Sequence, residues 1–481
     1  MKLAALARRP RFRGAVALFL LLALVYSFSV GLRATRGASI TGDEPFYLLT
    51  TQSLIQDGDL YLSQQYERES YRSFFDHPDG LWRQSVPTGD GRLLSPHEPG
   101  LSVLVIPGFA LGGLRGAQVE LLLIAALTFT LAFVLVSLET GSLGLSWLVT
   151  AAVGLSASAF VYSTEVYPEL PAGLCLVLAL LLLRRGAGGA RAGIGLALLL
   201  SALAWLGMKY VPLAALVAVA FLVASDQRGR LVLLSLSAVS GALYVWFHLA
   251  VFDDLTAYSL NTVYEGADAV SVLQSHVEFR ERAYRVWGLF IDQRFGIGRW
   301  APLLLLLIPA LAFLPRSGLV GHLTLVLICG QVLIATFVAI TMMGWWFPGR
   351  PLVVVLPLFP LALTPLIAGL PAAGKLFAAG LGAVSLYVTV ALQRAVAGAE
   401  VTLAVDPFDL DAPLFRALAS LFPSYQQWSA ETVVLTIGWL ALLAVALGAV
   451  LRRAYGGEPG VASAAAAPRR LTLRVLGWRR G

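Results

Sequence analysis

Long apolar runs, interrupted by few charged residues, restrict what this chain can fold into. About 20 consecutive apolar residues suffice for an α-helix to cross a bilayer. The chain is 58% hydrophobic and 13% charged, whereas a typical soluble domain carries about 25% charged residues. The sequence therefore predicts an all-α fold, a polytopic transmembrane helical bundle of about 12 spans. The predicted spans lie at 15–32, 117–138, 144–163, 170–183, 193–208, 212–224, 231–251, 300–314, 320–342, 351–369, 376–394 and 432–451.

The segment 99–114 decides the topology, because its crossing of the membrane would reverse the side of every later loop. It is apolar but short, and Pro107 and three glycines interrupt it. If it stays at the interface, the loops on one side carry 19 Lys and Arg and three acidic residues, whereas the remainder carries 16 basic and 25 acidic residues. Positive charge accumulates in cytoplasmic loops. We therefore expect both termini in the cytoplasm and an even number of spans in the cell membrane.

The predicted organisation is one transmembrane domain over residues 1–451 and a basic cytoplasmic tail over 452–481, which we expect to be disordered. The first outer loop, 33–116, is expected to hold surface helices, and 252–299 and 395–431 are the other large outer loops. The net charge of +7 follows from this asymmetry between the two sides, so we predict no nucleic-acid partner. The two cysteines lie in apolar runs and are typical of small buried residues.

Polar residues that are unusual near membrane helices gather at the outer ends of the predicted spans. Ionisable groups at membrane depth commonly face a cavity and mark a functional site. We therefore expect one outward-facing polar site built from several helix ends. Its candidate residues are Asp43, Glu44, His97, Glu165, Glu169, Lys209, Arg294, Arg299 and Arg350.

Most of these residues also have an ordinary explanation. The pair Asp43 and Glu44 could mark where a helix meets water, although the following PFYLLTTQSLIQDGDL is typical of an amphipathic surface helix. A lone Lys209 could extend its ammonium to the interface, and His97 could be a solvated loop residue. Glu165 and Glu169 are four residues apart and would share a face if this stretch were helical.

Three arginines are harder to explain singly, because they break the charge rule on the outer side. Arg294, Arg299 and Arg350 all lie near outer helix ends, and the planar guanidinium suits phosphate. Trp345 and Trp346 fit an interfacial aromatic belt and could equally stack on a sugar ring.

Three elements of the sequence resemble the GT-C superfamily of membrane glycosyltransferases. They are the acidic DE pair after the first span, the stretch PFYLLTTQSLIQDGDLYL that follows it, and HEPGL at 97–101. DQRFGIGRWAPLLLL and GWWFPGRPLVVVLPLFPLAL support the resemblance, which extends over about residues 40–370. The chain looks like the protein O-mannosyltransferase and aminoarabinose-transferase branch. It departs from that branch at His97-Glu98-Pro99, where better-known members carry His-Pro-Pro or Lys-Pro-Pro.

The resemblance implies an enzyme that transfers a sugar from a polyprenyl-phosphate donor on the outer face of the membrane, with inversion if attack is direct. Matching the DE motif makes Asp43 the general base, with Glu44 orienting the acceptor or assisting. The leaving phosphate would be neutralised by cationic or hydrogen-bonding residues, namely Lys209, Arg294, Arg299, Arg350 and His97. Glu165 or Glu169 would complete the site by holding a cation or pairing with an arginine.

The sequence leaves several features of this reaction open. The acidic residues could hold a divalent cation, yet some relatives need none. The sugar is a hexose or a pentose, and the acceptor is a lipid, a glycan or a protein. A secondary transporter or a flippase for lipid-linked sugars would also have about 12 spans and scattered charges. Convergence of Asp43, Lys209, Arg299 and Arg350 on one outer cavity would favour transfer, and their dispersal along a path through the membrane would favour transport.

Overall fold

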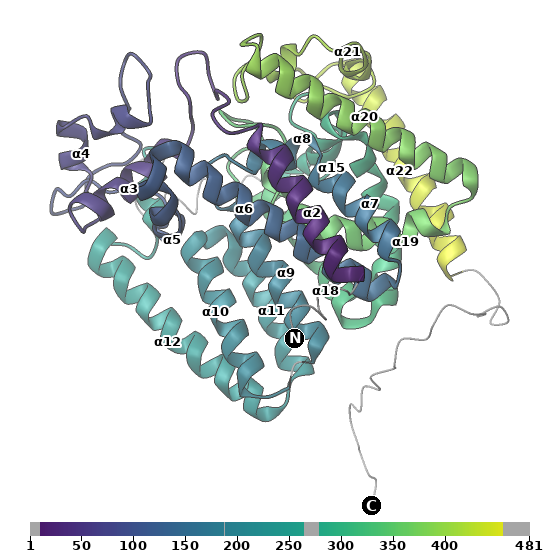
Figure 1. The fold of residues 1–481 in the computed structure, drawn as a ribbon, viewed down its shortest axis with the longest axis horizontal. Coiled ribbons are helices and arrows are strands. Elements are labelled where there is room, and N and C mark those ends of the chain that lie inside the picture. Colours follow the sequence, from purple (N-terminus) through teal and green to yellow (C-terminus); the bar gives the residue numbers. More distant parts are fainter. Residues whose placement is uncertain (1–9, 187, 264–278, 456–481) are drawn as a thin grey trace, which may run out of the picture.

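The computed structural model describes residues 10–186, 188–263 and 279–455, and this part of the chain is helical (Figure 1). Its only β-type pairing is an isolated bridge between Ser85 and Asn261. The all-α expectation is confirmed. The first helices of the described chain are α2 (Pro10–Ser27), α3 (Glu44–Gln56), α4 (Ser63–Glu67), α5 (Gly100–Leu104), α6 (Ile106–Thr140), α7 (Leu143–Gly154), α8 (Ala157–Tyr162), α9 (Glu169–Arg185), α10 (Ala190–Leu206), α11 (Val211–Ala224) and α12 (Gln227–Phe252).

The second half of the chain alternates short pieces with long helices. A one-turn π-helix at Ile334–Val338 continues α18, and short 3-10 turns cover Pro302–Leu306 and Arg350–Leu352. The helices here are α14 (Phe279–Arg282), α15 (Arg285–Ile291), α16 (Ile297–Trp300), α17 (Leu307–Ala310), α18 (Gly318–Leu333), α19 (Phe359–Gly369), α20 (Ala372–Ala397), α21 (Pro413–Ala419) and α22 (Ala430–Tyr455).

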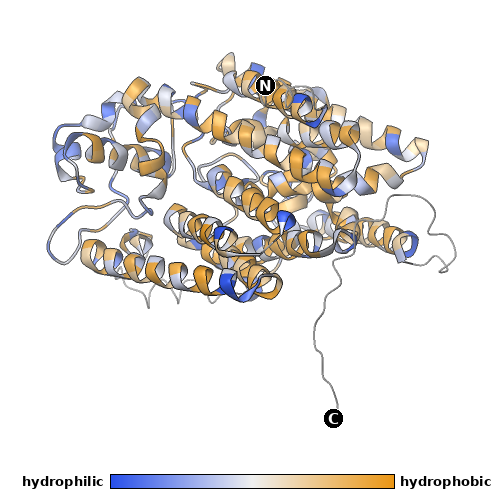
Figure 2. Ribbon diagram, turned by 60° about the horizontal axis from the view of Figure 1, so that its bottom comes forward, coloured by the Kyte–Doolittle hydropathy of each residue, from blue (hydrophilic) through white to orange (hydrophobic). Residues whose placement is uncertain are grey.

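Within the described residues, six helical stretches are long and apolar enough to cross a membrane, and four shorter apolar helices accompany them. The chain is therefore a multi-pass membrane protein, and twelve spans stays a prediction. Figure 2 shows apolar residues along most of the helices, with hydrophilic residues mainly at helix ends and connections. The proposed tail lies outside the described residues from residue 456 onward.

Glycine and proline divide several of the expected runs. Gly112 and Gly113 have non-helical backbone angles inside α6, so its first six residues are separated from the long helix that follows. The expected span 144–163 is divided between α7 and α8, and 300–314 consists of short 3-10 and α-helical pieces. No continuous helix therefore runs through 99–114, as the interruption of its apolar sequence predicted.

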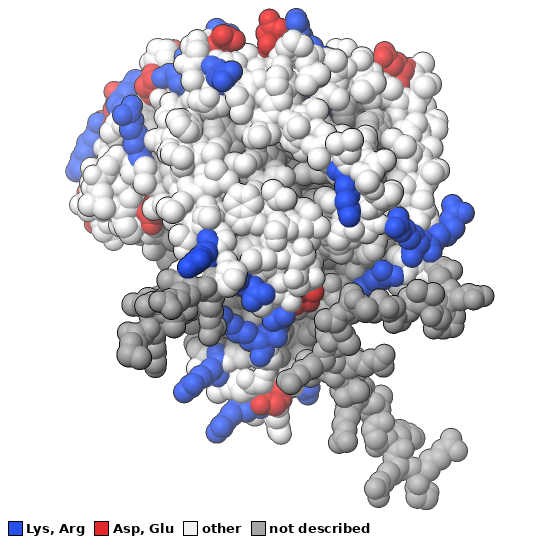
Figure 3. Space-filling view, turned by 45° about the vertical axis from the view of Figure 1, so that its right-hand side comes forward, with Lys and Arg blue, Asp and Glu red and all other residues white. Residues whose placement is uncertain are grey.

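Basic side chains gather at one end of the molecule, where the α9–α10 and α11–α12 connections lie (Figure 3). This group includes the exposed residues Arg184, Arg191, Arg228 and Arg230. The 17 residues of α10 begin at this end and rise about 25 Å at 1.5 Å per residue. The opposite end of α10 leads into Lys209, so the basic end lies away from the candidate site. Which end faces the cytoplasm stays a prediction.

Helix α3 corrects the expectation of an amphipathic helix on the surface. All ten residues from Glu44 to Ser53 are buried. Burial of Thr50 and Thr51 is possible because their hydroxyls donate to the carbonyls of Phe46 and Tyr47 one turn earlier. The helix therefore forms part of the wall of the site.

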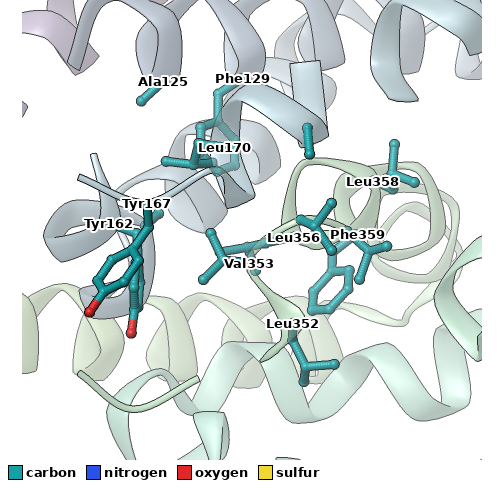
Figure 4. Packing of buried hydrophobic residues seen from close by; sticks show 14 of the residues in the cluster. Ala125, Phe129, Tyr162, Tyr167, Leu170, Leu352, Val353, Leu356, Leu358 and Phe359 are labelled. Carbon is teal, nitrogen blue, oxygen red and sulfur yellow. The ribbon is translucent and has the colours of Figure 1, made fainter. Parts of the chain in front are cut away.

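A buried apolar cluster from α6, the α8–α9 turn and residues 352–359 supports the same region (Figure 4). Tyr162 and Tyr167 lie at the edge of this cluster with ring centroids 6.0 Å apart. The Tyr167 ring lies under the guanidinium of Arg350, 3.7 Å from its central carbon. Apolar packing thus holds the Tyr167 ring against which the Arg350 guanidinium lies.

Candidate functional site

A large cavity of about 1630 Å³ lies where the ends of several elements meet. The start of α3, the start of α9, the α10–α11 connection and the segment before residue 352 all contribute to its lining. Five of the predicted site residues line it: Asp43, His97, Glu169, Lys209 and Arg350. The structure thus brings these five predicted residues to one cavity, and their role as a functional site stays a prediction.

Four of these residues form a continuous chain of ion pairs. Arg350 donates from Nη2 to Oδ2 of Asp43 at 2.8 Å and from Nε to Oε1 of Glu169 at 3.1 Å. Lys209 Nζ donates to the same Glu169 oxygen at 2.8 Å. The two acids stand at the N-terminal ends of α3 and α9, where the helix dipole favours negative charge. Two cations and two carboxylates are thus held together at the cavity wall.

The other oxygen of Asp43 belongs to a second network, which includes Gln84, a residue absent from the sequence prediction. Gln84 Nε2 donates to Asp43 Oδ1 at 3.2 Å, and Gln84 Oε1 lies 2.9 Å from Nε2 of His97. Because the carboxylate can only accept, the amide nitrogen faces Asp43 and the amide oxygen accepts from His97 Nε2–H. The His97 ring stacks on Tyr47 with centroids 4.8 Å apart. These contacts fix the orientation of the Asp43 carboxylate and of the imidazole.

Two glycines allow the charged residues to enter this arrangement. Gly42, directly before Asp43, has a φ of +61°, and a Cβ there would lie 2.6 Å from the Tyr167 hydroxyl. Gly349, directly before Arg350, has a φ of +86°, and a Cβ would lie 2.7 Å from Ser158 Oγ. Left-handed backbone is strained for residues other than glycine. The glycines in Gly-Asp-Glu and Pro-Gly-Arg are therefore needed for the backbone conformation that precedes Asp43 and Arg350.

The surroundings of Asp43 and His97 determine which of these two side chains is charged. Burial acts to raise the pKa of Asp43, but the charges of Arg350 and His97 and the hydrogen bonds from Arg350 and Gln84 outweigh it, so the pKa lies well below its usual range. Burial lowers the pKa of His97 to about 4. At neutral pH the site thus presents an ionised Asp43, 21% exposed, beside a neutral imidazole.

Glu44 and Glu165 lie behind the cavity wall. Glu44 accepts from the backbone N–H groups of Thr41 at 3.1 Å and Val166 at 2.9 Å, so it ties the start of α3 to the α8–α9 turn. Glu165 lies in that turn, before α9 begins. The condition under which Glu165 and Glu169 would share a helix face is not met, because a proline-containing turn precedes the helix and α9 begins only at Glu169. Neither Glu44 nor Glu165 lines the cavity, which favours a structural role for both.

The Glu44→Gln variant is expected to reveal the titration of this buried acid. Burial raises the pKa of Glu44 to about 7, above the value of about 4.3 in an unfolded chain. Ionisation of Glu44 therefore opposes folding, and its contribution to stability falls as pH rises from about 4.5 to about 7. The stability of Glu44→Gln relative to wild type should increase over this window and level off above it, as measured by thermal unfolding in detergent.

The slope of this difference is the readout, and the altered hydrogen bonding of glutamine adds only an offset that does not depend on pH. The wild-type curve alone does not isolate Glu44, because the lowered pKa of His97 acts in the opposite direction between about 4 and about 6.5. A difference that stays flat from pH 5 to pH 8 would contradict the shifted pKa.

Arg294 and Arg299 are two of the five residues that the sequence offers as candidates for binding the donor phosphate. Neither lines the cavity. The Arg299 guanidinium lies 3.7 Å over the Phe415 ring and donates to the backbone carbonyls of Phe415 and Gln293. Arg294 packs on a phenylalanine and donates to Gln426. Both guanidiniums thus pack on aromatic rings away from the cavity lining, and we omit both arginines from the proposed site.

Sequence reasoning missed the aromatic and amide part of the cavity. Gln84, Tyr47 and Trp82 line it beside the expected Trp345 and Trp346. Trp345 is largely exposed, whereas the indole N–H of Trp346 is buried without a hydrogen-bond partner. The tyrosines between residues 47 and 71, together with Trp82, were the available signal. No group of three or more His, Cys, Asp or Glu that could hold a metal occurs among the described residues.

Comparison with known proteins gives distant structural likenesses only. No protein-family model matches the chain, and no curated protein matches it. The chain is similar in structure to ArnT from Cupriavidus metallidurans bound to undecaprenyl phosphate, with a TM-score of 0.45, 14% identity, and coverage of 92% of this chain and 74% of that one. It is also similar to the apo oligosaccharyltransferase of Archaeoglobus fulgidus, with a TM-score of 0.37, 14% identity, and coverage of 89% and 59%.

Proposed function

We propose that the chain is an integral membrane glycosyltransferase that moves a sugar from a polyprenyl-phosphate donor to an acceptor hydroxyl on the outer face of the cell membrane. The observation that carries this proposal is the Asp43–Arg350–Glu169–Lys209 chain of ion pairs at the wall of a large cavity. Such transfer requires a base for the acceptor and cations for the leaving phosphate. The cavity offers both within one connected network.

The apolar part of the cavity suits the lipid portion of such a donor. Val211 and Pro212 at the start of α11 and Ile334, Ala335 and Val338 of the π-helical turn line the same space as the charged residues. Val211 and Val338 are also exposed at the surface of the bundle. A prenyl chain can lie against these residues from the bilayer side, with its phosphate at the ion pairs.

In the proposed reaction the acceptor oxygen attacks the anomeric carbon as the bond from that carbon to the phosphate oxygen breaks. Asp43 takes the hydroxyl proton, and polyprenyl phosphate leaves with one more negative charge than the donor diester carried. Lys209 and Arg350 neutralise this charge. As Arg350 turns toward the phosphate, its hold on Asp43 weakens, so the carboxylate becomes more basic when the proton must be taken. Direct displacement of this kind inverts the anomeric centre.

The transporter alternative receives less support from the placement of charge. Asp43, Lys209 and Arg350 meet at one cavity, whereas Arg299 lies outside it. Asp43, Lys209 and Arg350 therefore form one cluster at helix ends. A polar path for transport would instead require charged groups at successive depths of the bundle. Transfer is the function that this arrangement favours.

The Lys209→Met variant tests whether this cavity binds the donor phosphate. The Lys209 side chain is 43% exposed, so its ammonium can reach a ligand. Loss of one hydrogen bond to a charged group is worth about 1.5–3 kcal/mol, and we therefore expect about 10- to 100-fold weaker binding of polyprenyl phosphate. Binding can be followed by competition with a photoreactive polyprenyl phosphate on the purified protein.

Lys375→Met is the matched control, because Lys375 is exposed on α20 and does not line the cavity. The uncharged polyprenol should bind wild type and Lys209→Met equally. Unchanged phosphate binding in Lys209→Met, or an equal loss for the polyprenol, would contradict the assignment of this lysine.

A further inference from the structure

Glu98, the residue that departs from the His-Pro-Pro pattern, belongs to a buried hydrogen-bonded cluster with two residues of α12. Its Oε1 accepts from the hydroxyl of Tyr244 at 2.8 Å, and its Oε2 lies 2.6 Å from Nε2 of His248. His248 is completely buried, and Glu98 and Tyr244 are nearly so, although Glu98 also lines the cavity. We call Glu98, Tyr244 and His248 the Glu98 cluster.

The hydrogen bonds of this cluster fix its proton count. Nδ1 of His248 lies 2.8 Å from the Tyr244 carbonyl oxygen, which can only accept, so Nδ1 carries a proton. A second proton must then lie between His248 Nε2 and Glu98 Oε2, on one atom or the other. The pair is therefore neutral in total, and every polar atom in it is hydrogen-bonded. A fully satisfied buried network of this kind restrains its members to one arrangement.

The cluster holds the chain segment that carries His97. Glu98 follows His97 directly, and Gly100 packs so closely on the end of α10 that a Cβ would lie 2.2 Å from the Trp205 carbonyl oxygen. Trp205 in turn packs on His248, with ring centroids 5.8 Å apart. The segment 97–100 is thus fixed to α10 and α12 on one side, while the His97 imidazole faces Gln84 on the other.

We propose that Glu98 and His248 are positioning residues that hold His97 against Gln84 and thereby keep the Asp43 carboxylate in its orientation. His97 restrains Gln84 through its Nε2–H, and Gln84 donates to Asp43. Neither member of the Glu98–His248 pair needs to contact substrate in this role. The effect on turnover rests on the proposed function, whereas the restraint on His97 does not.

The restraint can be measured without enzyme activity, from the rate at which diethyl pyrocarbonate modifies His97 in the purified full-length chain. The His97 side chain is 8% exposed, so wild type should react slowly there. In His248→Phe and Glu98→Ala, we expect the rate at His97 to rise at least about fivefold, because losing a buried hydrogen bond favours local opening. Peptide mass spectrometry reads each histidine separately.

Glu98→Gln is the conservative variant that separates positioning from charge. A glutamine amide can donate to the unprotonated Nε2 of neutral His248, and its oxygen can accept from Tyr244, so the geometry is kept without an ionisable acid. We expect His97 in this variant to stay as protected as in wild type. If His248→Phe does not fold, Tyr244→Phe removes one hydrogen bond alone and should give a smaller increase in the same direction.

Two controls distinguish a specific exposure of His97 from a general loss of structure. His77 is 37% exposed and should react at the same rate in every variant. His322→Phe removes a helix histidine whose Nδ1 likewise lies 2.7 Å from a carbonyl four residues earlier, that of Gly318, but which lies outside the cavity lining. It should leave His97 protected. Unchanged protection in His248→Phe, or Glu98→Gln as reactive as Glu98→Ala, would overturn the proposal.

Kinetics give the second arm of the test. If the proposed transfer occurs, His248→Phe should lower kcat by up to about 10²-fold, the loss that a misplacement of about 1 Å can cause, with little change in KM for the donor. Glu98→Gln should restore near wild-type kcat. Wild type that turns over no donor, with His97 nevertheless exposed by His248→Phe, would remove the proposed function and leave the positioning role intact. A fall in kcat without exposure of His97 would overturn the positioning role.

Discussion

The Asp43→Asn variant is expected to lose about 10²- to 10⁴-fold in kcat, the range that a general base contributes. Asparagine fits the same space, and its oxygen can still accept from Arg350, but it cannot take a proton. Donor binding should change less than kcat, because Lys209 and Arg350 are still present. The measurement is initial rates with a polyprenyl-phosphate sugar, beside thermal unfolding of the purified protein.

The matched control for this variant is Asp76→Asn. Asp76 also pairs with an arginine, Arg33 at 2.8 Å, but both partners are about half exposed and neither lines the cavity. It should retain wild-type kcat. If Asp43→Asn kept more than about a tenth of wild-type kcat, well above the range for loss of a base, Asp43 would not be the base.

Arg350→Met is expected to have the largest effect on stability. The side chain of Arg350 is 10% exposed and bridges Asp43 and Glu169. Its removal leaves Asp43 without a cation, while Glu169 keeps Lys209. Breaking a buried ion pair by removing one partner costs about 3–5 kcal/mol, so we expect a clear fall in the unfolding temperature in detergent, together with loss of transfer.

The double variant Asp43→Asn/Arg350→Met identifies the source of this loss. Neutralising Asp43 removes the uncompensated charge, so the double variant should be more stable than Arg350→Met alone. Arg33→Met, which breaks the half-exposed pair with Asp76, should cost no more than about 1 kcal/mol. A double variant less stable than Arg350→Met would show that the buried acid is not the cause.

The sequence predicted the residues whose chemistry is unusual for their place in the chain. Asp43, Lys209 and Arg350 stand at the ends of apolar runs, where charge is costly without a partner, and the structure brings all three to one cavity. Gln84 was not predictable, because an amide in a long loop is ordinary until the fold places it against Asp43. The misplaced Arg294 and Arg299 have a similar cause, since sequence does not show which backbone carbonyls will take up a guanidinium.

The sequence predicted well which segments are helical, but it predicted poorly which helices are buried. The apolar runs indicated the helices, and the glycines of 99–114 indicated the break at Gly112, whereas the division of 300–314 into short helical pieces was not predicted. The hydroxyls of Thr50 and Thr51 in helix α3 can be buried because they donate to carbonyls of the helix itself. That pattern cannot be distinguished from an amphipathic surface helix by the spacing of polar residues alone.

The most direct test of the central claim is turnover of a radiolabelled polyprenyl-phosphate sugar panel by the purified chain, supplied with membrane extract as the source of acceptor. The account predicts that one donor loses its sugar to an acceptor, or to water when no acceptor is present, and that Asp43→Asn abolishes this at equal expression. Absence of turnover with every donor, in protein that is folded and binds polyprenyl phosphate, would contradict sugar transfer.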